Sequence, residues 1–256
     1  MNLYDDMIAR CHGMLNPFSV SCKHYHIPER IVVKSGEKTS CDEALWEQED
    51  EQRILFKKDT AYELGGGGFS AYSGVAFTSD ETVKDEIVVC GPDLPELKAD
   101  SPYARLTILR VDDSAWTDNG QAYKVLRRLD YTRYHVRPKG FLMRISAAAH
   151  REPVRVGREA LRSGLGFEQV GRLFSAAYHS HPEVLGVRIF FITEPDFPYE
   201  EFGQTVRQMD AVTESLNEIF NNLIMDCATC RLKPVCDEVE GLRELHFAAK
   251  KEMPVQ

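Results

Sequence analysis

Three cysteines near the end of the chain have the spacing of a metal site. Cys227, Cys230 and Cys236 form the pattern C-x2-C-x5-C. A C-x2-C turn brings two thiolates to one metal, and a third cysteine a few residues later supplies a third corner of a tetrahedral or cuboidal site. Pro234 restrains the loop before the third cysteine, which lowers the entropy cost of ordering it. We therefore predict a metal or cluster in this segment.

A fourth ligand for this centre must come from elsewhere. Cys41 is the first candidate, because it begins a predicted helix whose N-terminus would stabilise a thiolate. Cys22 and Cys11 are the next candidates, whereas Cys90 ends a predicted core strand and is expected to pack rather than to bind metal. If the metal is zinc, His246 could complete a Cys3His set.

Two other fates for the clustered cysteines stay open, namely buried thiols that continue the preceding helix and a disulfide. The chain has seven cysteines, an odd number, and its acidic N-terminus does not have the basic and apolar regions of a signal peptide. No apolar run reaches about 18 residues, which is the length that spans a membrane. We expect a cytoplasmic protein without a membrane partner, where reducing conditions make a disulfide the least favoured fate.

The charge of the chain is unevenly distributed. The net charge of -9 argues against nucleic acid as a general partner. The segment from Lys124 to Arg162 nevertheless carries eleven Lys or Arg against three Asp or Glu, a net charge of +8, which leaves -17 for the rest. This segment is either a solvated basic face or a site for an anion, such as a phosphorylated cofactor or an acidic redox partner.

Other residues of catalytic type are not organised into a recognisable site. The pairs His24/His26 and His179/His181 are i, i+2 pairs that could bind metal from a strand, but neither lies in a clear strand pattern, so surface or capping roles are expected. The four glycines at 65–68 lack the Lys-Ser or Lys-Thr and the helix start of a phosphate loop. No G-x-S-x-G element supports hydrolase chemistry.

The elements expected to position these residues alternate strands and helices. Apolar patterns predict strands at 30–34, at 53–57, on both sides of the four glycines, before Gly91-Pro92, at 104–111 with alternating burial, at 141–146 and at 187–193. Helices are predicted near the N-terminus and at 41–51, 119–134 and 198–225, with one or two more within 153–178. The two glycine-flanking strands would form a hairpin or a wide turn.

We predict an α+β or mixed α/β fold: a mixed sheet flanked by helices, with a C-terminal Cys-rich segment. Residues 1–52 would form an N-terminal helical and strand extension. Residues 53–225 would form the main α/β domain, and residues 226–256 a Cys-rich metal-binding tail packed on it.

Five short blocks in the middle of the chain occur in the order found in a known family. They are YELGGGG (62–68), DEIVVCGPDL (85–94), LRRLDYTRY (126–134), FLMRIS (141–146) and RIFFIT (188–193). Together they resemble the central domain of the β subunit of the carbon monoxide dehydrogenase/acetyl-CoA synthase complex. The family's active-site cluster domain includes a C-G-C type element, and the present sequence contains no Cys-Gly-Cys. We therefore do not expect the chain itself to make acetyl-CoA.

The resemblance implies an accessory iron-sulfur protein acting in electron transfer or assembly in anaerobic one-carbon metabolism. Its cofactor would be a [4Fe-4S] cluster rather than zinc, and its partner a carbon monoxide dehydrogenase, corrinoid or ferredoxin-type protein. It also implies coenzyme A or another phosphorylated ligand, held by Arg127, Arg128 and Arg144 with Asp93 as an acid or base. A zinc-stabilised interaction module is the third hypothesis. Catalysis stays open; any reaction would be a redox or acyl-transfer step.

Overall fold

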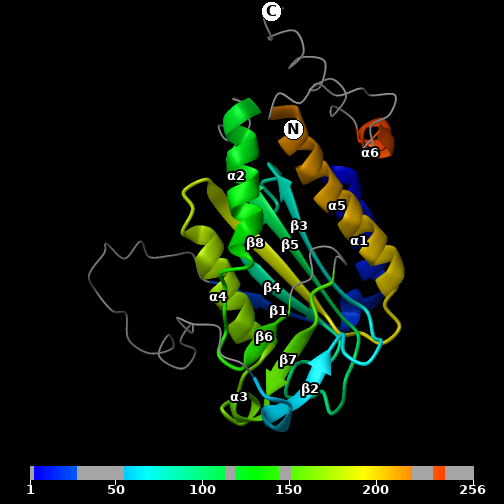
Figure 1. The fold of residues 1–256 in the computed structure, drawn as a ribbon, viewed down its shortest axis with the longest axis vertical. Coiled ribbons are helices and arrows are strands. Elements are labelled where there is room, and N and C mark those ends of the chain that lie inside the picture. Colours follow the sequence, from blue (N-terminus) through cyan, green and yellow to red (C-terminus); the bar gives the residue numbers. More distant parts are fainter. Residues whose placement is uncertain (1–2, 28–54, 113–118, 145–150, 221–232, 240–256) are drawn as a thin grey trace, which may run out of the picture.

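The computed structural model describes residues 3–27, 55–112, 119–144, 151–220 and 233–239. These residues form two β-sheets, and helices cover both faces of the larger sheet (Figure 1). The fold is therefore the mixed α and β arrangement that the sequence predicts.

The larger sheet has five strands in the order β1-β4-β8-β5-β3. The strands are β1 (Cys22–His26), β4 (Glu86–Cys90), β8 (Val184–Ile192), β5 (Tyr103–Val111) and β3 (Ala71–Thr78). The pairs β4-β8 and β5-β3 are parallel, whereas β1-β4 and β5-β8 are antiparallel. The N-terminal segment thus contributes an edge strand to the main sheet.

Helices pack on opposite faces of this sheet. Helix α4 (Phe167–His179) contacts β4 and β8 on one face, and α5 (Tyr199–Phe220) covers β3 on the other, where it also packs against α1 (Asp5–Leu15). Because both faces are covered, β5 is buried along almost its whole length. The alternating burial expected for this strand is therefore wrong.

Helix α5 follows from its sequence. Apolar residues at three- and four-residue steps predict one buried face, and the structure buries them: Phe202, Val206, Met209, Val212 and Leu216. Glu200 and Glu201 in the first turn are favourable at the positive end of the helix dipole. Gly74 of β3 allows a close approach, since a Cβ there would lie 2.9 Å from Val206 Cγ2.

The smaller sheet has three antiparallel strands in the order β2-β7-β6. They are β2 (Thr60–Leu64), β7 (Val154–Gly157) and β6 (Phe141–Met143), and α3 (Arg158–Arg162) directly follows β7. The predicted helical region at 153–178 therefore begins with a strand. Strands β2 and β3 belong to different sheets, so the glycines between them form a wide turn rather than a hairpin.

Three further segments complete the described chain. Helix α2 (Asn119–Thr132) agrees with its prediction and contacts both α4 and α5, and α6 (Lys233–Glu238) packs near α5. The 3-10 helices are η1 (Asn16–Ser21) and η3 (Lys57–Asp59). In η3 the amides of Asp59 and Thr60 both bond to the carbonyl of Phe56, so a turn replaces the described part of the strand predicted at 53–57. The elements predicted at 30–34 and 41–51 lie outside the described residues.

None of the helices in the described ranges is long and apolar enough to cross a membrane.

Candidate functional site

Two arginines of the smaller sheet converge on one carboxylate. Arg144 Nη2 lies 2.6 Å from Glu63 Oε2, and Arg155 Nε lies 2.8 Å from Glu63 Oε1. Glu63 and Arg155 are register partners in β2 and β7, and Arg144 follows β6. The side chains of Arg144 and Arg155 are 40% and 27% exposed. A guanidinium carries five N–H donors, so both keep donors for a further anion.

The glycine turn after β2 lies against this carboxylate. A Cβ at Gly66 would lie 2.6 Å from Glu63 Cβ and 2.8 Å from Glu63 Oε2, so the approach requires glycine. Arg151 Nη2 donates to the carbonyl oxygens of Gly65 at 3.1 Å and of Phe69 at 2.6 Å. The turn therefore has a third guanidinium beside it. We call Glu63, the 65–68 turn and these three arginines the arginine-glycine site.

Two more carboxylates flank the turn. Asp100 Oδ1 accepts a hydrogen bond from the backbone amide of Glu63 at 2.7 Å. Glu200 accepts from the hydroxyls of Ser70 at 2.7 Å and Tyr72 at 2.9 Å. The arginine-glycine site thus combines cationic donors with carboxylate acceptors. Such a site suits a ligand that carries phosphates together with hydroxyl or amino groups.

The protonation of Glu63 is controlled by its arginines. Partial burial by itself raises the pKa of this carboxyl, but the hydrogen bond from Arg155 and the charges of Arg144 and Arg155 outweigh burial and lower the pKa. Glu63 is therefore a carboxylate at neutral pH and keeps both guanidiniums in place.

A buried ion pair fixes the strand that carries Arg155. Arg105 Nη2 of β5 lies 2.6 Å from Glu152 Oε1, with side chains only 1% and 4% exposed. Arg105 also donates to Ser73 Oγ and stacks over the ring of Phe174 at 4.0 Å. This network ties the smaller sheet to the larger one, because Glu152 comes just before β7.

Arg127 and Arg128 have different partners from Arg144 and lie elsewhere in the structure. Arg128 pairs with Glu183, which precedes β8, and Arg127 donates to the hydroxyl of Tyr123 and lies 5.4 Å from the ring of Tyr131. Both arginines are exposed on α2. The three predicted ligand-binding arginines thus divide between the smaller sheet and α2.

Asp93 has structural contacts. Its Oδ1 accepts from the backbone amide of Phe167 at 2.8 Å and from that of Leu94 at 2.6 Å. Phe167 is the first residue of α4, so Asp93 caps that helix from the loop after β4. These two bonds give Oδ1 of Asp93 a structural role.

The predicted metal ligands lie largely beyond the described ranges. Cys41, Cys227 and Cys230 are outside them, and Cys236 is placed in α6 only by its backbone. Within the described ranges no group of three or more His, Cys, Asp or Glu side chains could hold a metal ion.

A disulfide joins two cysteines for which the sequence predicted separate roles. Cys22 of β1 and Cys90 of β4 are direct register partners with Cα atoms 4.2 Å apart, and they form a disulfide. The interpretation of Cys22 as a metal ligand is therefore wrong, whereas Cys90 packs in the core as expected, with a disulfide that the sequence did not predict. The two cysteines are 68 residues apart in the chain, so their spacing does not predict the disulfide. The antiparallel register of β1 and β4 brings them together. Burial raises the pKa of the Cys11 thiol to about 12, which makes it a poor ligand.

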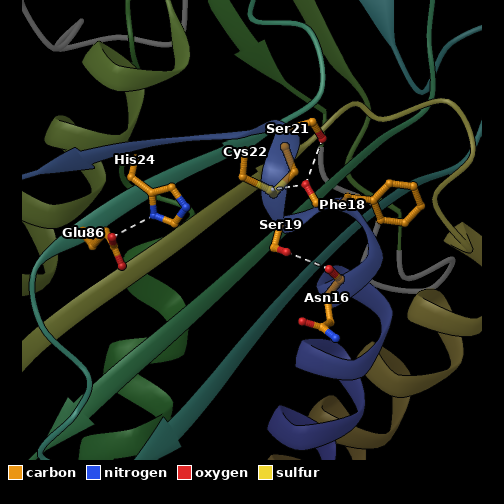
Figure 2. Close-up of a disulfide and its surroundings, with 8 residues drawn as sticks. Asn16, Phe18, Ser19, Ser21, Cys22, His24 and Glu86 are labelled. Carbon is orange, nitrogen blue, oxygen red and sulfur yellow. Dashed lines mark hydrogen bonds and ion pairs between the residues drawn. A yellow bond between two sulfur atoms is a disulfide. The ribbon is translucent and has the colours of Figure 1, made fainter.

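A pocket of about 400 Å³ opens beside this disulfide. Both cysteines line it together with residues of α1, η1 and the sheet, among them His12, Asn16, Ser19, His24, Val88 and Phe190. Figure 2 shows His24 on the same side of β1 as Cys22, with its imidazole directed at Glu86; Nδ1 lies 2.9 Å from Glu86 Oε1.

The histidine pairs have different environments. His24 and His26 do lie in a strand, contrary to the expectation, because polar residues can form an edge strand. Both face Glu86, with His26 Nδ1 at 3.9 Å from Oε1. His179 ends α4 and lies 2.8 Å from Asp85 Oδ1, whereas His181 follows that helix.

The sequence reasoning missed Glu63, Arg151 and Arg155. Both arginines lie in the basic segment, but the helix predicted within 153–178 hid the strand that carries Arg155, and Arg151 lies before that strand. The alternation of Val154, Arg155 and Val156 was the available signal, and three residues are too few to distinguish a strand from a helix.

Comparison of the sequence with protein-family models gave no match, and comparison with curated proteins gave no relative.

Proposed function

We propose that the chain is an accessory protein similar to the central domain of the acetyl-CoA synthase β subunit, and that it binds coenzyme A or a related phosphorylated ligand at the arginine-glycine site. The convergence of Arg144 and Arg155 on Glu63 beside the 65–68 turn is the observation that carries this proposal. A guanidinium can donate two parallel hydrogen bonds to one phosphate group. The neighbouring carboxylates of Asp100 and Glu200 would accept hydrogen bonds from ribose hydroxyls or an adenine amine.

The motif blocks of the resemblance support this location. Two of them, YELGGGG and FLMRIS, contribute β2 with its turn and β6, which together supply Glu63 and Arg144. The proposed binding site therefore uses Arg144, Arg151 and Arg155. Of the three arginines predicted from the sequence, it keeps only Arg144. Arg127 and Arg128 would instead present charge on α2 to an acidic protein partner, such as a ferredoxin, a corrinoid protein or carbon monoxide dehydrogenase.

Isothermal titration of the whole protein with coenzyme A tests this site. We expect saturable binding that weakens at least tenfold in Arg144→Gln and Arg155→Gln and falls as salt increases. Arg128→Gln is the matched control, since its guanidinium pairs with Glu183, and it should bind within about twofold of wild type. Absence of heat at millimolar coenzyme A, or equal loss in the control, would contradict the proposal.

An iron-sulfur centre is the second part of the proposed role. The structure assigns Cys22 and Cys90 to a disulfide and Cys11 to the core. The four other cysteines are Cys41, Cys227, Cys230 and Cys236, the set predicted to bind the metal. A bound [4Fe-4S] cluster would supply one-electron transfer; zinc would instead supply only structural stability.

Anaerobic purification followed by iron, zinc and acid-labile sulfide analysis distinguishes these metals. Absorption near 400 nm with stoichiometric iron and sulfide, lost in Cys230→Ser and kept in Cys11→Ala, is the expected result. Stoichiometric zinc would support the interaction module instead, and metal-free protein would contradict both. The proposed role places the protein in the cytoplasm, where a disulfide such as Cys22–Cys90 is usually redox-active rather than only structural.

A further inference from the structure

We propose that Cys22–Cys90 is a thiol-exchange site, at which a low-molecular-weight thiol enters the adjacent pocket and forms a mixed disulfide with Cys22. This site is separate from the arginine-glycine site and does not depend on the role proposed for it. Three features carry the inference: the open pocket against both sulfurs, the unequal access to them, and a carboxylate-held imidazole on the same strand face.

Access selects the sulfur that is attacked. Cys22 is half-buried in edge strand β1, whereas Cys90 is 1% exposed in the neighbouring inner strand β4. The pocket of about 400 Å³ has the volume of a small-molecule site. Exchange requires the attacking thiolate to reach one sulfur. Cys22 is therefore the acceptor and Cys90 the leaving group.

His24 is in position to handle the proton. A carboxylate only accepts, so the Nδ1 of His24 donates to Glu86, and Nε2 is the ring nitrogen that is left to accept a proton in the exchange. His24 and Cys22 are two residues apart on one strand face, which directs both side chains to the same side (Figure 2). His24 is thus a positioning and proton-accepting group beside the disulfide.

The charged surroundings of His24 come from four elements, the first of which is β4 with Glu86. On its own strand His26 also faces Glu86, and from β8 Arg188 Nε lies 3.0 Å from Glu86 Oε2. From α1, His12 lines the same pocket; desolvation lowers its pKa, and the charge of Arg188 lowers it further. His12 is therefore neutral at pH 7. It does not repel a small thiol that carries an ammonium group.

The exchange balances without an external oxidant. The thiol transfers its proton to His24 Nε2, its sulfur bonds to Cys22 Sγ, and the Cys22–Cys90 bond breaks, leaving the electron pair on Cys90 Sγ, which takes the proton back. A second thiol then attacks the mixed disulfide. The products are two cysteine thiols in the protein and one small disulfide, and the two small thiols are the reductant.

Reduced glutathione and whole oxidised protein provide the test, with peptide mass spectrometry as the readout. We expect glutathione on Cys22 and none on Cys90 while the protein stays folded. With glutathione disulfide as the reagent, Cys90→Ser should accumulate the Cys22 adduct, because no Cys90 thiol is present to displace it, and Cys22→Ser should form none. An adduct on Cys90, or no exchange in the folded protein at millimolar glutathione, would overturn the proposal. Failure of glutathione disulfide to reoxidise the reduced Cys22 and Cys90 thiols would overturn it as well.

The role of His24 has its own readout. At pH 7 His24→Gln should slow exchange about tenfold, and the difference should shrink to about twofold at pH 9, where the small thiol is largely ionised without help. His179→Gln is the matched control, because that imidazole is also held by a carboxylate, Asp85, but does not line the pocket. Equal slowing at both pH values would assign His24 a purely structural role.

Discussion

Arg105 and Glu152 form a buried ion pair that joins the two sheets, with Nη2 and Oε1 2.6 Å apart. Arg105 lies in a central strand of the larger sheet, and Glu152 precedes the central strand of the smaller one. Glu152 also donates its backbone amide to the carbonyl of Ala71. The position of Arg151 and Arg155 at the arginine-glycine site therefore depends on a contact made in the core.

Breaking this pair should be costly. Arg105→Met leaves Glu152 buried without its cation, so we expect the free energy of unfolding to fall by about 3–5 kcal/mol. Urea denaturation measures the loss. Arg172→Met removes an exposed pair with Glu168 and should change the free energy by less than about 1 kcal/mol. A loss in Arg105→Met no larger than this control would contradict the predicted cost of breaking the buried pair.

The close approach of Gly66 to Glu63 predicts a strong effect of one methyl group. Gly66→Ala should lower the free energy of unfolding by about 1–3 kcal/mol, because its Cβ would overlap the Glu63 side chain. It should also weaken coenzyme A binding by moving that carboxylate from Arg144. Gly13→Ala in α1 is the control, since a Cβ there meets nothing within 4 Å, and it should be neutral or stabilising by up to about 1 kcal/mol.

The lowered pKa of Glu63 predicts the pH dependence of stability. Because the pKa is lower in the folded than in the unfolded protein, ionised Glu63 contributes stability above its unfolded value of about 4.3 and loses it as the pH falls through the folded pKa. Glu63→Gln should therefore be less stable than wild type at pH 7, and the difference should shrink below about pH 4. Urea titrations between these values would contradict this account if the difference were constant.

The disulfide should contribute to stability as well as to exchange. It closes a loop across a separation of 68 residues, for which chain entropy gives about 4 kcal/mol. A reducing agent should lower the free energy of unfolding of the wild type by up to this amount. The double variant Cys22→Ala/Cys90→Ala should show the lower value and should not respond to the reducing agent. A response in the double variant would assign the effect to other thiols.

Much of the fold was predictable because it depends on local patterns. The apolar spacing of α5 and the apolar runs of β4 and β8 specify these elements without reference to their neighbours, whereas for β5 the strand was predicted but its burial on both faces was not. The strands that the sequence did not predict are short or polar. Strand β1 reads CKHYH and β7 reads VRVG, and such strands exist because a partner strand offers a free edge.

The sequence by itself determined the chemical inventory: the clustered cysteines, the basic segment, the glycine turn and the order of the motif blocks. Only the tertiary structure decided which of these residues meet. The pairing of Cys22 with Cys90 follows from an antiparallel register, and that of Glu63 with Arg144 and Arg155 from the pairing of β2 with β7, which is distant from it in the chain. Such contacts depend on strand order and register, which are set by burial across the whole molecule and not by the spacing of the residues themselves.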